Sequence, residues 1–169
     1  MDNNVHHYEL VRLSTHEDVD VYEMLQHIGP SENSFSNEAY GLSEAQWRKW
    51  LVKQEAWSRG ECLPDGYVPQ ISYWLYADGT PVGYGKIRLA LTEESKKAGG
   101  TIGYAIDSRW RGRGYGTQLM KMLLEESRSL ALKDVLLTVE EQNAASRRAI
   151  EKCGARKVDE RDGWIYFVV

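Results

Sequence analysis

A glycine-rich basic turn constrains the fold of this chain more than any other segment. Residues 107–117 read Asp-Ser-Arg-Trp-Arg-Gly-Arg-Gly-Tyr-Gly-Thr. A strand-like run from Thr101 leads into the turn, and apolar residues at helical spacing follow over 116–132. Glycines let several backbone N–H groups converge on one anion, at the end of a helix where the dipole favours negative charge. The segment therefore predicts a strand, a phosphate-binding loop and a helix, in that order.

The charge balance of the whole chain limits what this turn can bind. Arg109, Arg111 and Arg113 place three cations within five residues, yet the formal net charge of the chain is -4. An acidic chain has no global basic field to hold a nucleic-acid backbone or an anionic membrane surface. We therefore expect a local anion site, with no nucleic acid and no membrane among the partners. A nucleic-acid binder that uses these three arginines stays as a competing hypothesis.

Two common nucleotide-binding motifs are absent from the chain. A Walker A loop needs a glycine followed by Lys and then Ser or Thr, and no glycine here meets that requirement. A GxGxxG fingerprint fails because Thr117 stands at the last glycine position counted from Gly112, and Leu119 stands there counted from Gly114. The turn thus predicts a different ligand that carries a pyrophosphate.

The first half of the chain predicts helices and a β-hairpin. A capping box of Ser43 and Gln46 starts a helix whose Trp47 and Trp50 we expect in the core. The expected elements are a strand at 8–13, a helix from about residue 17 capped by Ser14-Thr15 and ended by Gly29-Pro30, a polar loop at 31–42, the helix after residue 43, and strands at 68–76 and 80–91 joined at Asp78-Gly79, with Gly83 and Gly85 as points of a bulge or close approach.

The second half predicts strands and helices in alternation. The expected elements are a strand at 101–107, a helix at 116–132, a strand at 135–139 buried on both faces, a helix at 144–153 and a hairpin at 156–169 turning at Asp162-Gly163. The length of 169 residues and the 42% of hydrophobic residues suit one domain. We expect an α/β (α+β) fold over residues 1–169, with a mixed, mostly antiparallel sheet flanked by helices.

Two motifs resemble those of a known enzyme superfamily. The RxxGxG pattern at 111–116, preceded by a strand that ends at 104–106, resembles the acyl-CoA loop of the GNAT-type N-acetyltransferases. Downstream, Asn143-x-x-Ser146 opens a helix in the way of the Asn-led motif that follows the fifth strand of that superfamily. Strand, loop, helix, strand, Asn and helix occur in the expected order over 100–155. The resemblance therefore extends to most of the chain.

The resemblance implies a single GNAT-like domain that uses acetyl-CoA as cosubstrate. Its fourth and fifth strands would splay apart between Ile106 and Val139, and the pantetheine arm would pair with the exposed strand edge. A backbone N–H near Ile106 would stabilise the tetrahedral oxyanion. The acceptor would be a primary amine of a small molecule or peptide. The implied cofactor-binding residues are Ile106, Arg111, Gly112, Arg113, Gly114, Tyr115, Gly116, Thr117, Asn143 and Ser146.

The general base and general acid differ from those of some family members. Enzymes that acetylate protein N-termini are among those that use a Glu on the fifth strand and a Tyr in the next helix, and Thr138 and Ile150 occupy these positions here. This difference argues against that substrate class. Our candidates, in order, are Glu140 as base, directly or through water, then Tyr104 and Asp107.

The missing Glu and Tyr keep a second function open. A catalytically silent acyl-CoA-binding module would need the glycine loop but neither catalytic residue. The acceptor also stays open, because a lysine side chain, an amino sugar, a polyamine and an antibiotic are all chemically suitable amines. The resemblance implies that residues 60–69 border the acceptor site.

Cysteine and histidine usage predicts an intracellular protein without a metal site. Cys62 and Cys153 are the two cysteines, and neither they nor the four histidines have metal-ligand spacing. The N-terminus has no secretory pattern and the chain has no run of eighteen apolar residues, so we expect a cytoplasmic location. The terminal hairpin offers an edge at which a homodimer could form.

Overall fold

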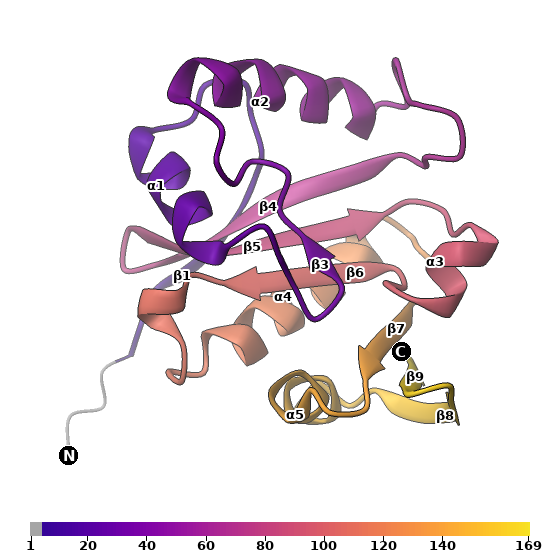
Figure 1. The fold of residues 1–169 in the computed structure, drawn as a ribbon. Coiled ribbons are helices and arrows are strands. Elements are labelled where there is room, and N and C mark those ends of the chain that lie inside the picture. Colours follow the sequence, from indigo (N-terminus) through magenta and orange to yellow (C-terminus); the bar gives the residue numbers. More distant parts are fainter. Residues whose placement is uncertain (1–4) are drawn as a thin grey trace.

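The computed structural model describes residues 5–169 (Figure 1). The helices are α1 (Val19–Ile28), α2 (Glu44–Ser58), α3 (Glu93–Lys97), α4 (Tyr115–Ser129) and α5 (Ala144–Lys152), with a 3-10 turn at Ser108–Trp110. The strands are β1 (Tyr8–Arg12), β2 (Ser31–Glu32), β3 (Phe35–Ser36), β4 (Gln70–Ala77), β5 (Thr80–Arg88), β6 (Ile102–Ile106), β7 (Leu136–Glu140), β8 (Arg156–Arg161) and β9 (Trp164–Val168).

The strands form two main antiparallel sheets flanked by helices. One sheet has the order β1-β4-β5-β6 and the other has the order β7-β9-β8. Helices α1 and α2 cover one face of the larger sheet and α4 covers the other, while α5 packs on α4 and β7 (Figure 1). This arrangement confirms the expected α/β class. None of the helices within residues 5–169 combines the length and the apolar content needed to cross a bilayer.

Strands β6 and β7 touch at one end and then separate. The Thr101 N–H donates to the Leu136 carbonyl at 2.7 Å, and the Leu136 N–H donates to Thr101 Oγ1 at 3.0 Å. Beyond this point the two strands belong to different sheets, so the expected splay of the fourth and fifth strands is confirmed. Gly100 permits the contact, because a Cβ there would lie 2.5 Å from the Leu136 carbonyl oxygen.

Glycines on β5 let helix α4 approach the larger sheet closely. A Cβ at Gly83 would lie 2.8 Å from Ile106 Cδ1, and one at Gly85 would lie 2.6 Å from Leu123 Cδ1. The expected close approaches are therefore present. Leu119 and Leu123 of α4 fill the space and are fully buried. On the other face, the expected core positions of Trp47 and Trp50 are confirmed.

Two helix boundaries differ from the sequence-based prediction. Helix α1 begins at Val19 with Asp18 at its N-cap, because the Glu17 carboxylate accepts the Ser14 N–H at 2.7 Å and holds this segment in a turn. Helix α4 ends at Ser129 because Ala131 adopts a positive φ of 56°, which a right-handed helix cannot contain.

Two other segments also differ from the prediction. The polar loop at 31–42 contains the short hairpin of β2 and β3. Strand β7 is buried on one face only, where Leu137 and Val139 point, whereas Leu136 and Thr138 are partly exposed. The reason is that no long helix covers the second face, which meets the short α3. The open edge expected at the terminal hairpin is β8, whose residues are all exposed.

Candidate active site

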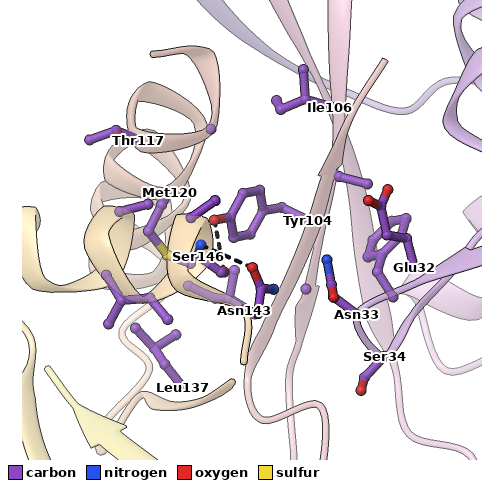
Figure 2. A pocket seen from close by; sticks show the side chains of 18 of the residues that line it. Glu32, Asn33, Ser34, Tyr104, Ile106, Thr117, Met120, Leu137, Asn143 and Ser146 are labelled. Atoms are coloured by element: carbon purple, nitrogen blue, oxygen red, sulfur yellow. Dashed lines mark hydrogen bonds between the residues drawn. The ribbon is translucent and has the colours of Figure 1, made fainter. Parts of the chain in front are cut away.

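A cavity of about 330 Å³ lies in the gap between β6 and β7. Its walls come from the glycine loop and the start of α4, from α5, from β6, and from the hairpin of β2 and β3. Figure 2 shows Tyr104 and Ser146 on one side of β6, and Glu32, Asn33 and Ser34 on the other. The cavity therefore reaches both faces of the sheet, with a loop end and a hairpin end.

The glycine loop presents backbone N–H groups at the loop end. Gly112 and Gly114 have φ values of 74° and 85°, and a Cβ at either would meet no atom within 4 Å. Gly114 is the N-cap of α4 and has no side chain to cap it, and the first bond of the helix runs from the Gln118 N–H to the Gly114 carbonyl at 3.1 Å. Within residues 5–169, the N–H groups of 115–117 have no partner. These N–H groups can donate hydrogen bonds to an anion.

Asp107 is not available as a base. Its side chain is fully buried and accepts the Arg109 N–H at 2.8 Å, while its second oxygen accepts Arg109 Nη2 at 2.6 Å. The ion pair fixes the 3-10 turn that leads into the glycine loop. The interaction also raises the pKa of Arg109. The third sequence candidate for proton transfer therefore has a structural role.

The other two arginines of the loop also have partners. Arg111 Nε donates to the Ile106 carbonyl at 3.1 Å, and its two terminal nitrogens form a bidentate ion pair with Glu32. The Arg113 guanidinium lies 4.9 Å from the centre of the Trp110 ring and does not line the cavity. The loop is therefore less cationic than its sequence indicates, and its anion site consists mainly of backbone amides.

The edge of β6 presents unpaired backbone groups to the gap. The Asp107 N–H bonds to Val82 on β5 at 3.0 Å, and the Thr101 carbonyl accepts from Arg88 at 2.8 Å. Because bonding alternates along an antiparallel ladder, the N–H groups of 102, 104 and 106 point away from β5. The predicted pairing edge near Ile106 thus faces the cavity.

Tyr104 reaches from β6 to α5 across the cavity. Its hydroxyl lies 2.9 Å from Ser146 Oγ, and the Ser146 N–H donates to Asn143 Oδ1 at 3.2 Å, which caps α5 (Figure 2). The Tyr104 ring packs against Gly116, where a Cβ would lie 3.4 Å from Cε2. Burial raises the pKa of Tyr104 above its ordinary value, and the hydrogen bond between Tyr104 and Ser146 opposes this shift. Tyr104 is therefore protonated at neutral pH.

Glu140 lies at the rim of the hairpin end and does not line the cavity. Its carboxylate accepts Ser34 Oγ at 2.9 Å and Gln142 Nε2 at 3.2 Å. Thr138 and Ile150, at the positions of the missing Glu and Tyr, do line the cavity. Thr138 Oγ1 accepts the Gly99 N–H at 2.7 Å, so it also helps to hold the start of β6.

The family model of the acetyltransferase (GNAT) family matches residues 22–155. The chain belongs to the GNAT acetyltransferase family. It is therefore an acyltransferase, and the resemblance seen in its sequence is confirmed. No curated protein shows significant sequence similarity to it.

Solved structures show the same fold for this GNAT acetyltransferase. The ribosomal-protein-S5-alanine acetyltransferase from Vibrio fischeri is 14% identical, with 96% of this chain and 92% of that chain covered and a TM-score of 0.67. RimL, a ribosomal alpha-N-protein acetyltransferase in complex with coenzyme A, is 14% identical, with 95% and 92% covered and a TM-score of 0.66. The Campylobacter jejuni N-acetyltransferase PseH in complex with acetyl coenzyme A is 12% identical, with 96% and 98% covered and a TM-score of 0.63.

Sequence reasoning missed the hairpin end of this GNAT cavity. Residues 60–69, expected to border the acceptor site, do not line it, whereas residues 32–36 do. Two-residue strands have no periodicity that a sequence could reveal. Lys86 and Arg88 of β5 also line the cavity, and one signal for Lys86 was present: it is the single charged residue in the run 80–87.

The cysteines lie outside the cavity. Cys62 is exposed and Cys153 is partly buried, and both are free thiols. Burial raises the pKa of the Cys153 thiol, whose sulfur faces the Thr117 carbonyl at 3.8 Å. This environment disfavours the thiolate that nucleophilic catalysis requires. Across residues 5–169, no three His, Cys, Asp or Glu side chains gather as a metal site would need.

Proposed function

We propose that this protein transfers an acetyl group from acetyl-CoA to a primary amine of a small molecule or peptide, by direct attack in a ternary complex. The observation that carries this proposal is the cavity that reaches both faces of the sheet through the gap between β6 and β7. Two substrates can enter it from opposite ends and meet at β6. The structures of RimL with coenzyme A and of PseH with acetyl coenzyme A support the choice of cosubstrate.

In this proposal, backbone groups bind the cosubstrate. The pyrophosphate lies on the N–H groups of 112–117, where the positive φ values of Gly112 and Gly114 turn the backbone and the α4 dipole favours an anion. The amide-bearing pantetheine arm pairs with the outward N–H groups of Tyr104 and Ile106, as an added strand would. Asn143 and Ser146 support the arm from α5. The side chain of Arg111 ties this loop to the β2–β3 hairpin through its ion pair with Glu32.

The reaction needs an oxyanion donor and a proton donor. The Ile106 N–H faces the gap, and one such donor is worth roughly 3 kcal/mol in comparable acyl transfers. The Tyr104 hydroxyl is protonated and lies inside the cavity, so it can protonate the leaving thiolate. Ser146 fixes the position of that hydroxyl. Tyr104 thus supplies from β6 the phenol that Ile150 lacks.

Glu140 is the proposed base, and it acts through water. Its carboxylate lies at the rim, close to the hairpin end, and Ser34 orients it. The expected result for Glu140→Gln is a fall in kcat of at least tenfold with little change in acetyl-CoA affinity. Steady-state kinetics and CoA titration measure the two quantities. Unchanged turnover would remove Glu140 from the mechanism.

The proposal extends to the whole chain and its location. We propose that residues 1–169 act as one N-acetyltransferase domain. Its free cysteines are compatible with the reducing cytoplasm, where we place the reaction. The competing function is the catalytically silent acyl-CoA-binding module, which the substitutions at Thr138 and Ile150 motivate.

One experiment separates these functions. Calorimetric titration with CoA should show saturable binding, and its absence would contradict both. A panel of lysine peptides, amino sugars, polyamines and aminoglycosides, with detection of released thiol, then tests for transfer. Release above background hydrolysis with at least one amine supports the enzyme. Saturable CoA binding without release for any amine would favour the silent module.

A further inference from the structure

Two cations of one strand line the hairpin end of the cavity. Lys86 and Arg88 are two residues apart on β5, so their side chains point to the same face of the sheet, opposite α4. Lys86 is only 5% exposed. Its ammonium donates to the Ser36 carbonyl at 2.6 Å and lies 4.8 Å from the centre of the Phe35 ring. A charged group is thus buried in largely apolar surroundings.

Neither cation has a carboxylate partner within residues 5–169. Arg88 Nη1 donates to the carbonyls of Gly99 and Gly100 at 3.2 and 2.9 Å. The charge of Glu38 acts on Lys86, but Glu38 forms no ion pair with it and contacts Lys53 at 3.8 Å. A buried charge without an ionic partner is costly, and an apolar side chain of similar size would pack here at lower cost.

The acids of the cavity do not compensate these charges. Glu32 is the one carboxylate among the described lining residues, and Arg111 already neutralises it. The remaining lining cations, Arg148 and Lys152, belong to α5 on the cofactor side. At the rim, the Glu140 carboxylate accepts hydrogen bonds from Ser34 and Gln142 and forms no ion pair with either cation. Lys86 and Arg88 therefore lack an ionic partner among the described residues, which points to an anionic ligand.

We infer that the amine acceptor also bears an anionic group, a carboxylate or a phosphate, and that this group binds Lys86 with support from Arg88. This inference rests on the proposed function, because it assigns the hairpin end to the acceptor. The Ser36 carbonyl and the Phe35 ring contact the Lys86 ammonium on its protein side. The anionic group of the acceptor would contact the same ammonium from the cavity.

The electrostatics of the site agree with this assignment. Burial lowers the pKa of Lys86 to about 8; Glu38 opposes this shift and Arg88 adds to it. Lys86 therefore keeps its charge at neutral pH. The charged Lys86 can therefore form an ion pair with the anionic group of the acceptor.

Matched acceptors test the inference. Phosphoethanolamine is compared with ethanolamine, and β-alanine with β-alaninamide, by kcat/KM from thiol release. For at least one pair, we expect the anionic member to exceed its neutral analogue at least tenfold, and the pair that does so distinguishes phosphate from carboxylate. Equal values within both pairs would overturn the inference.

Variants assign the preference to Lys86. Lys86→Met should reduce the ratio of the two kcat/KM values to near one, Lys86→Gln should do the same, and Lys86→Arg should restore most of it. Lys49→Met, which removes an exposed lysine of α2 outside the cavity, is the matched control and should keep the wild-type ratio. A lysine that only held Ser36 would affect both members of a pair equally, so an unchanged ratio in Lys86→Met contradicts the inference.

A binding measurement tests the anion site separately from acetyl transfer. If no amine is acetylated, phosphoethanolamine and β-alanine are titrated calorimetrically into the CoA-loaded protein. Binding that Lys86→Met weakens at least tenfold supports the anion site even without transfer. Absence of binding to the folded wild-type protein, with CoA binding intact, would overturn it. Thermal unfolding of each variant confirms that the comparison is made on folded protein.

Discussion

The two ends of the cavity are built in different ways. The loop end is made of backbone N–H groups from one continuous segment, 112–117, and its arginine side chains are engaged elsewhere. The hairpin end is made of side chains that are far apart in the sequence, such as Glu32, Lys86 and Thr138. The loop end therefore depends on backbone conformation, whereas the hairpin end depends on which side chains the fold brings together. Substitutions should affect the two ends differently.

The largest effect is expected at Tyr104, where the two ends meet. Tyr104→Phe removes the hydroxyl but keeps the ring against Gly116, so kcat should fall about a hundredfold while CoA affinity changes little. Steady-state kinetics and calorimetry measure these values. Tyr73→Phe is the matched control, because its hydroxyl bonds to Glu126 outside the cavity.

The pH dependence of this step follows from the burial of Tyr104. Its raised pKa keeps the acid protonated, so the alkaline loss of kcat that it causes should begin above the ordinary tyrosine value of 10.0. Tyr104→Phe should lack that loss. If the wild-type kcat shows no such alkaline loss and the Tyr104→Phe variant is active, the proton that reaches the thiolate comes from water and not from Tyr104.

A smaller effect is expected at the loop end. Gly114→Asp places a carboxylate beside the bound pyrophosphate, and CoA affinity should weaken at least tenfold, about 1.4 kcal/mol. Gly114→Asn is the matched control, since Asn has the same shape and also tolerates a positive φ. It should lose clearly less affinity. Equal losses in both variants would mean that the side-chain volume matters and the charge does not.

The smallest effect is expected at Glu32. Glu32→Gln removes a largely exposed ion pair with Arg111, so the free energy of unfolding should change by less than about 1 kcal/mol. Because the hairpin is then held less firmly, the KM for the acceptor should rise about two- to threefold, while the KM for acetyl-CoA stays the same. Glu44→Gln, which removes a remote pair with Arg48, is the control. If only the KM for acetyl-CoA changed, the hairpin would contribute to cosubstrate binding and not to acceptor binding.

Much of the fold was predictable because its signals are local. The turns at Asp78-Gly79 and Asp162-Gly163 and the capping box of Ser43 and Gln46 lie where the sequence predicts them. The failures occurred where a side chain or a single backbone angle outweighed the apolar pattern. Glu17 delays the start of α1, and the positive φ of Ala131 follows the end of α4. Hairpin residues 31–36 have no pattern long enough to detect.

The candidate site was predictable in part for the same reason. The glycine loop and its outward amides could be derived from residues that are neighbours in the chain. The pairing of Asp107 with Arg109 was not foreseen, although they are close in sequence, because a carboxylate that ends a strand can point to either face. The position of Glu140 at the rim, outside the lining, depends on how far β7 diverges from β6.

The sequence by itself determined the strand, the glycine loop and the helix that form the loop end of the cavity, because positive φ, capping and helix dipoles depend on adjacent residues. Only the tertiary structure decided which charges remain uncompensated. Arg109 and Arg111 are neutralised by partners that the fold provides, whereas Lys86 is buried without one. Burial and pairing are properties of segments packed together, and the hairpin end of the cavity therefore emerged only from the folded chain.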